Sequence, residues 1–349
     1  MNLVRGYLSE LRRAAVAEWN RFWFTPADPV TLALIRILAG AMLLYTHLVW
    51  TLGLTDFFGD HSWVSAEAAA LAHGTGDATS YVWSYHWLLR SPAALWTAHI
   101  AGLVVFAMLT LGLFSRVTSV LAYLVAVSYV NRVPGALFGL DQINCMLAMY
   151  LMIGPSGAAW SLDRLLAARK GRGRLPPAEP STSANLAIRL MQLQMCVIYF
   201  FAGLGKLHGE SWWGGDAIWG AVANLEYQSL DMTWLASWPL TVAVITQVTV
   251  YWELFFCALV WPRLLRPLVL SLAIPLHLGI AVCMGMITFG LVMLIGCVSF
   301  VPPWLVRRLF SGVSSAGEDE QSAKGNEGLR KRGSRDAGKV ASGKIRVES

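Results

Sequence analysis

Eight apolar runs, most of them close to twenty residues long, constrain the fold of this chain more than any other feature. A helix needs about 20 mostly apolar residues to cross the hydrocarbon core of a bilayer. The runs cover roughly residues 29–52, 93–113, 117–133, 138–155, 185–205, 238–260, 264–284 and 287–309. They predict an all-α fold, a polytopic bundle of about eight transmembrane helices. The third and fourth runs are short, so a tilted, kinked or partly re-entrant segment stays open for each.

Composition and charge indicate a lipid environment. Only 14% of the 349 residues are charged, and 16 are tryptophan, whereas ordinary soluble domains carry about 25% charged residues. The formal charge of +6 would suit nucleic acid, but ten of the 27 lysines and arginines lie at or beyond Arg307, and most others lie in short loops. That distribution is a topology signal. We therefore expect the lipid bilayer as a partner and no nucleic acid.

The basic residues also predict the orientation. If the N-terminus is cytoplasmic, 22 of the 27 lysines and arginines fall in inner segments. The other five are Arg36, Arg90, Arg132, Arg189 and Lys206. Because cytoplasmic loops carry an excess of lysine and arginine, we predict that both termini are cytoplasmic, N-in and C-in.

Three parts are predicted along the chain. Residues 1–28 place apolar side chains at helical spacing among charges, which favours an amphipathic interfacial helix, with a helix packed on the bundle as the alternative. Residues 29–310 form the transmembrane domain, whose long outer segments, 53–92 and 206–237, hold aromatics suited to the headgroup level. The basic stretch 311–349 has almost no large apolar residue, so we expect a disordered cytoplasmic tail.

Motifs for metal, nucleotide or hydrolase chemistry are absent from the sequence. The five cysteines lie inside apolar runs without a CxxC pair, and we interpret them as packing residues. There is no HxxxH, HExxH, Walker loop or GxSxG. We expect no metal cofactor.

Ionisable residues inside the apolar runs divide into two layers by depth. Such residues are costly in a membrane and tend to face the bundle interior. An inner layer holds Arg36, Arg189 and Glu253, which we expect to form structural ion pairs. An outer layer holds His47, Asp141, Asn144, Lys206, His208 and His277. His47 and His277 could each be a hydrogen-bonded residue of the bundle interior and not a ligand, and Asp141 could be a helix cap.

Lys206 ends a polar stripe on one helix. Gln192, Tyr199, Gly203 and Lys206 fall on one side of the helix predicted over 185–205, so Lys206 is expected to face the bundle. A snorkelling lysine usually sits on a lipid-facing surface. A lysine partly withdrawn from water can act instead as a base. From spacing alone, a catalytic base and a helix-end anchor both remain open.

The stretch YFFAGLGKLHGESWWGGDAIW, residues 199–219, resembles the centre of the vitamin K-dependent γ-carboxylase family and its bacterial relatives, the HTTM (horizontally transferred transmembrane) domain proteins. Supporting blocks are LALIRILAGAMLL, DQINCMLAMYLMIGPSGAAWSLDR, IRLMQLQMCVIYFFAGLGKL, YWELFFCALVW and PLHLGIAVCMGMITFGLVML. Together they cover most of residues 29–300, in order. The resemblance implies a multi-pass protein of a bacterial inner membrane.

The resemblance also implies a chemistry. In the carboxylases a lysine in this stretch is the base that deprotonates vitamin K hydroquinone, and it falls on Lys206 here. Oxygen then turns that cofactor into a strong base, which abstracts a proton from a peptide glutamate for CO2 to attack. The expected cofactor is thus a reduced naphthoquinone. The expected pocket near the outer leaflet is lined by His277, Asp141, His47, Tyr199 and Gln192.

Two departures limit the resemblance. Family carboxylases can carry two adjacent lysines where this chain has Gly205 and Lys206. They also have a large extramembrane region after the spans that helps present the protein substrate, whereas the expected disordered tail follows the spans here. We therefore expect a quinone-dependent, carboxylase- or epoxidase-like enzyme that does not carboxylate proteins. The first alternative is a non-enzymatic membrane scaffold or partner-binding subunit. The second is a transporter, which the lack of a convincing internal repeat disfavours.

Overall fold

The computed structural model describes residues 2–59, 61–73, 82–171 and 178–311. The tail predicted over 311–349 lies outside these residues except for Ser311. The chain divides into two units, Met1–Val301 and Pro302–Ser349, and each is considered by itself. The second unit contributes one described helix, α15 (Pro303–Ser311).

The described residues are helical and contain no β-strand. In the first unit the α-helices are α1 (Asn2–Phe24), α2 (Val30–Trp50), α3 (Leu54–Phe58), α4 (Ala66–Ala72), α5 (Pro92–Leu111), α6 (Ser115–Arg132), α7 (Gly139–Ile153), α8 (Leu162–Lys170), α9 (Thr182–Lys206), α10 (Glu210–Gly214), α11 (Ala217–Val222), α12 (Pro239–Leu259), α13 (Arg266–Cys283) and α14 (Ile287–Cys297). Single 3-10 turns join several of them, among them η2 (Tyr85–Leu88) and η5 (Val298–Phe300).

Five segments of the described chain are long and apolar enough to cross a membrane: Val30–Phe58, Pro92–Leu111, Thr182–Lys206, Pro239–Leu259 and Arg266–Cys283. Two further predicted runs fold as the shorter or less apolar helices α6 and α7. The run predicted over 287–309 is not one helix. Helix α14 ends at Cys297, and the 3-10 turn η5 follows over Val298–Phe300. Pro302 lacks the backbone N–H that a helix would need to continue beyond η5. Eight full spans are therefore not found among the described residues.

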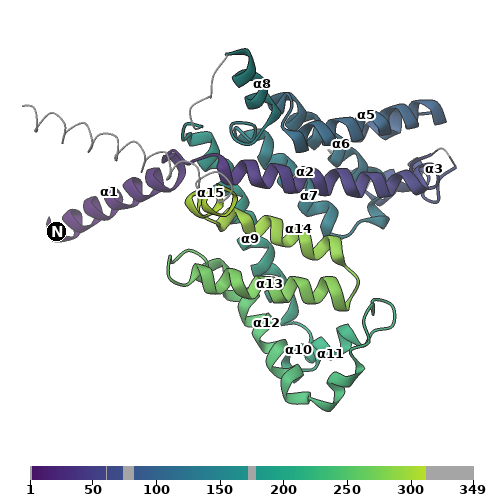
Figure 1. Ribbon diagram of the computed structural model, residues 1–349. Coiled ribbons are helices and arrows are strands. Elements are labelled where there is room, and N and C mark those ends of the chain that lie inside the picture. The colour runs from purple at the N-terminus through teal and green to yellow at the C-terminus, as the bar shows by residue number, and fades with distance from the viewer. Residues whose placement is uncertain (1, 60, 74–81, 172–177, 312–349) are drawn as a thin grey trace, which may run out of the picture. The chain divides into compact units, whose positions relative to one another are not determined.

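Helices α2 and α7 connect two packed halves of the first unit (Figure 1). One core cluster joins them to α5 and α6, around Leu43, Phe106 and Leu109. A larger cluster joins them to α9, α12, α13 and α14, around Tyr199 and Phe256. Side chains on two faces of α7 therefore belong to two different environments.

Small residues let the helices approach closely. A Cβ on Gly203 of α9 would lie 2.9 Å from the Leu254 backbone nitrogen of α12. A Cβ on Gly40 of α2 would lie 2.7 Å from Thr110 Oγ1 of α5. Glycine at these contacts allows dense packing without the hydrophobic drive available in water.

Helix α1 is exposed along most of its length, including Val4, Tyr7, Leu8 and Leu11. Its C-terminal end is held by α9, where Asn185 Nδ2 donates to the carbonyls of Phe22 at 2.8 Å and Trp23 at 2.9 Å. An interfacial role for this helix stays a prediction.

Candidate functional site

Lys206, the last residue of α9, forms an ion pair with Glu253 of α12. Its Nζ lies 2.6 Å from Glu253 Oε2, and the two side chains are 23% and 8% exposed. A Lys side chain in a helix leans back toward the N-terminus, and so does a Glu side chain. Because α9 and α12 run in opposite directions, these leanings bring the amine and the carboxylate together.

The ion pair lies on the wall of a cavity of about 310 Å³. Helices α7, α9, α12, α13 and α14 supply its walls. The apolar lining residues are Gly139, Ile143, Met146, Ile198, Ala202, Leu276, Ile280, Phe289 and Met293. The polar lining residues are Gln142, Gln194, Tyr199, Lys206, Glu253 and His277. This is a mainly apolar space with a few polar groups, as small-ligand sites usually are.

Tyr199 and His277 form a hydrogen-bonded pair on this wall. His277 Nδ1 lies 2.8 Å from the carbonyl of Ala273, which can only accept, so Nδ1 carries the proton and Nε2 is the acceptor. Tyr199 then donates its hydroxyl to Nε2 at 3.2 Å. Cys297 Sγ lies 3.3 Å from the same hydroxyl. The predicted residues Tyr199 and His277 thus lie in one cavity with Lys206.

Gln192 lies elsewhere. Its Nε2 donates to the carbonyl of Ser299 at 2.7 Å, and its Oε1 accepts from Arg189 at 2.9 Å, so it ties α9 to η5 and does not line the cavity. Gln194 of α9, which is not a member of the predicted polar stripe, does line it. The hydroxyl of Tyr150 donates to Gln194 Oε1 at 3.3 Å. Gln142 and Glu253 are the other polar lining residues that the sequence did not indicate for this pocket.

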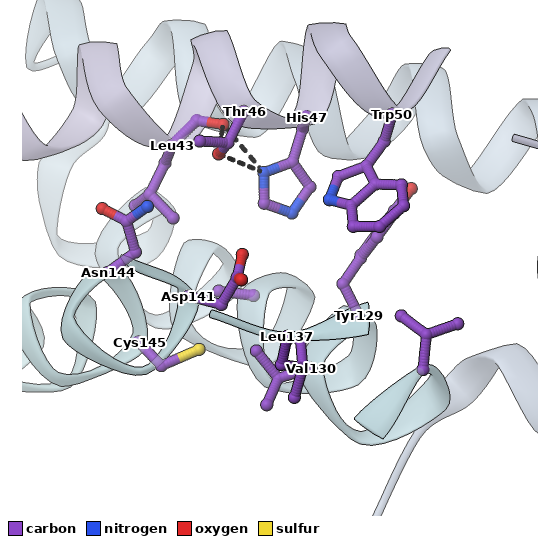
Figure 2. Close-up of a pocket in the computed structure, with 12 residues that line it drawn as sticks. Leu43, Thr46, His47, Trp50, Tyr129, Val130, Leu137, Asp141, Asn144 and Cys145 are labelled. Carbon is purple, nitrogen blue, oxygen red and sulfur yellow. Dashed lines mark hydrogen bonds between the residues drawn. The ribbon is translucent and has the colours of Figure 1, made fainter. Parts of the chain in front are cut away.

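His47 and Asp141, predicted for the same pocket, lie in a separate and far smaller chamber of about 10 Å³. Residues of α2, α6 and α7 line it, and Figure 2 shows the Asp141 carboxylate pointing toward the His47 ring. His47 Nδ1 donates to the carbonyl of Leu43 at 2.8 Å, and Nε2 has no partner among the described residues. Asp141 also accepts from the Phe138 amide at 3.0 Å, the capping contact open to it from sequence. The chamber has room for about one water molecule.

A histidine cluster extends from this chamber. His99 Nδ1 lies 2.6 Å from the hydroxyl of Tyr129, and the rings of His47 and His86 pack edge-on to Tyr129 at 4.6 Å and 4.5 Å. His86 lies in η2, outside the long helices, and burial lowers its pKa to about 3, with the charge of Arg132 adding to the shift. These side chains fill the space around the chamber by packing against one another.

The expected ion pairs of the inner layer are not formed in the described part of the chain. Glu253 pairs with Lys206. Arg36 is fully buried and donates to the carbonyls of Ser156 at 2.9 Å and Trp160 at 2.6 Å. Arg189 bonds Gln192 and stacks over the ring of Phe22 at 4.4 Å. The prediction of Arg36, Arg189 and Glu253 as one group was wrong because depth along a helix does not show which way a long side chain extends.

The segment after α9 folds back beside the Lys206 amine. The ring of Trp212 in α10 lies 5.2 Å from Lys206 Nζ. The Trp212 carbonyl accepts from Gln247 Nε2 of α12 at 2.8 Å. A Cβ on Gly209 would lie 2.9 Å from Trp212 Cδ1, so glycine allows the tight turn that brings this ring over the amine.

Comparison with known proteins identifies the family. The HTTM domain family matches residues 24–304, which include all the cavity residues. The chain belongs to this family. The HTTM domain and the five long apolar helices together indicate a multi-pass membrane protein. No curated protein and no solved structure matched the chain. Among the residues that the structure describes, no group of three or more His, Cys, Asp or Glu could hold a metal ion.

Proposed function

We propose that this HTTM protein is a membrane-embedded enzyme that acts with a reduced naphthoquinone and that Lys206 accepts a proton in the reaction. One observation carries the proposal. The amine of Lys206 ends at a cavity of about 310 Å³ inside a bundle of apolar helices, beside a carboxylate. A helix-end anchor would need neither the cavity nor the acid.

The cavity suits a reduced naphthoquinone in size and in chemistry. Sites for small ligands have volumes of about 300–1,000 Å³ and mostly apolar walls. Here Ile143, Phe289 and Met293 provide apolar contacts for a ring, while Lys206 and His277 provide polar ones. A reduced naphthoquinone bound there supplies an ionisable hydroxyl and electrons for oxygen.

Lys206 and Glu253 together can take up one proton. In the ion pair the amine is an ammonium and the acid is a carboxylate. The ammonium passes a proton to Glu253, and the neutral amine then takes the proton of a ligand hydroxyl. The pair ends as ammonium and carboxylic acid, so it has gained one proton. The ammonium stays beside the oxygen that has become negative and stabilises it, an effect that is strong where water is excluded.

The proposed reaction is carboxylase- or epoxidase-like, in the inner membrane of a bacterium, with Lys206 at the outer side of an N-in, C-in bundle. Purified protein in nanodiscs is incubated with a reduced naphthoquinone and oxygen, and mass spectrometry follows the epoxide. We expect product from the native protein and a loss of about 10²–10⁴-fold in Lys206→Arg, the usual contribution of a general base. Equal rates for the two proteins would reject Lys206 as the base.

A further inference from the structure

The tryptophan pair Trp212 and Trp213 presents two neighbouring indoles in different surroundings. The ring of Trp212 lies 5.2 Å from the Lys206 ammonium nitrogen. The ring of Trp213 is 64% exposed, and its Nε1 donates to the Leu207 carbonyl at 2.7 Å. Of these two rings, the first is therefore the one that contacts the charge at the end of α9.

Trp212 is held in this position by contacts on two sides. Gln247 of α12 donates to its carbonyl, and the turn at Gly209 leaves room for its ring. The same helix α12 carries Glu253. The ammonium of Lys206 thus meets a carboxylate at 2.6 Å and an aromatic ring at 5.2 Å.

Both contacts favour the charged amine. A cation near the face of an indole is attracted by the ring quadrupole, by about 0.5–2 kcal/mol depending on how far water is excluded, which corresponds to a factor of about 2 to 30 in an equilibrium constant. The titratable groups lining the cavity around this amine are Tyr199, Glu253 and His277. They come from the long helices, whereas Trp212 comes from the segment beyond the end of α9.

We infer that Trp212 is a positioning residue that covers the amine of Lys206 at the end of α9 and holds Lys206 in its charged form until a ligand enters the cavity. The effect of Trp212 on the accessibility and charge of Lys206 does not depend on the proposed function. Its control of Lys206 as a catalytic base rests on the proposed function. Trp212 touches Lys206 and is not assigned a contact with the reacting ligand.

The test measures the reactivity of the Lys206 amine directly. Full-length protein in nanodiscs is treated with an amine-acylating reagent over a range of pH, and peptide mass spectrometry gives the rate at Lys206. Lys170, which is exposed in α8, is the internal reference. Only the neutral amine reacts. The midpoint of the rate profile therefore gives the pH at which Lys206 loses its proton, and the plateau at high pH gives the accessibility of the amine to the reagent.

Trp212→Leu is expected to move the midpoint to lower pH by about 0.3 to 1.5 units, which is the pH equivalent of a cation–π contact. The plateau rate should rise several-fold because the Lys206 amine is no longer covered by the ring. Trp213→Leu is the matched control and should change neither quantity. Trp212→Phe keeps an aromatic face, so its midpoint pH should lie closer to that of the native protein than to that of Trp212→Leu.

Identical profiles for Trp212→Leu and Trp213→Leu would overturn the inference, as would a higher plateau without a shift of the midpoint. Where Trp212→Leu does not fold, Gln247→Leu loosens the same segment by removing the hydrogen bond to the Trp212 carbonyl, and it should both raise the plateau and lower the midpoint. The proposed function fails in a different way. In that case Lys206→Arg keeps the rate of naphthoquinone conversion, whatever the acylation profiles show.

Discussion

The two cavities that border α7 make a useful comparison, because both are lined by polar residues and only one has room for a ligand. On one face of α7, Gln142 lines a cavity of about 310 Å³ together with Lys206 and Glu253. On another face, Asp141 lines a chamber of about 10 Å³ together with His47. In the chamber, His47 Nδ1 and the Asp141 carboxylate bond to backbone groups, and the remaining space is too small for more than about one water molecule. Open volume beside an acid–base pair, and not polarity alone, distinguishes the candidate site.

The largest expected effect concerns the two carboxylates. Glu253→Leu leaves the ammonium of Lys206 without its partner at the cavity, which costs about 3 kcal/mol when one member of a buried pair is removed. Asp141→Leu removes a helix cap, which costs about 1 kcal/mol. Thermal melting in detergent measures both. Equal destabilisation by the two variants would contradict the comparison.

Substitution of one alanine in the wall of each cavity tests how much free space that cavity contains. Ala126 lines the chamber and is 2% exposed, so Ala126→Leu overpacks it and should cost about 2 kcal/mol. Ala202 lines the larger cavity, and Ala202→Leu should cost less than about 1 kcal/mol because the added carbons enter open space. Denaturation of both variants tests the difference. If Ala202→Leu is the more destabilising, the larger cavity is not open in the native protein.

The histidine cluster beside the smaller chamber should make the stability of the folded protein sensitive to acid. Burial lowers the pKa of His86 to about 3 from an ordinary value of 6.5. Below pH 6.5 the unfolded chain binds a proton that the folded chain does not, so stability falls as the pH drops, by at most about 1.4 kcal/mol per pH unit. His86→Phe should show a flatter dependence between pH 6.5 and 5.5. A slope equal to that of the native protein would assign the acid sensitivity to other groups.

The smallest expected effect lies away from both cavities, at the start of α6. Asp163 accepts from the amides of Phe114 at 2.8 Å and Ser115 at 2.9 Å. Burial raises the pKa of Asp163, but the hydrogen bonds from Ser115 and Phe114 outweigh it and hold the pKa below its ordinary value of 3.8.

Asp163→Asn keeps one accepting oxygen but replaces the other with an NH2 group that cannot accept from Ser115, so it should cost about 1 kcal/mol at neutral pH, the usual net contribution of a hydrogen bond. The native contribution of Asp163 is complete above pH 3.8 and is lost as the pH falls through the lower folded value. Melting curves of both proteins from pH 7 to pH 3 measure this difference, which should narrow in acid. A gap that widens as the pH falls would contradict the lowered pKa of Asp163.

Much of the helical architecture could be predicted from the sequence. Apolar length alone placed the five long spans, and the stripe on α9 correctly turned Tyr199 and Gly203 inward, where both are buried. The break in the eighth run could have been predicted from the pair Pro302 and Pro303, because proline interrupts a helix and is tolerated in its first turn, where Pro303 begins α15.

The composition of the site could be predicted only in part. Periodicity shows which residues share a face of one helix, but not which helices lie next to that face. Asp141 and Gln142 are adjacent in sequence and border different cavities, because successive residues point about 100° apart around α7. Depth likewise placed Glu253 with the arginines, whereas opposite helix directions bring it to Lys206.

The most direct test of the proposed function asks on which face of α7 a naphthoquinone binds. A photoreactive naphthoquinone is cross-linked to the native protein in nanodiscs, and peptide mass spectrometry locates the labelled residues. We predict labels on cavity residues such as Tyr199, His277 and Phe289, with competition by unlabelled naphthoquinone and loss of labelling in Ala202→Phe. Labels confined to His47 and Tyr129, or spread over the lipid-facing surface without competition, would contradict the assignment of the larger cavity as the site.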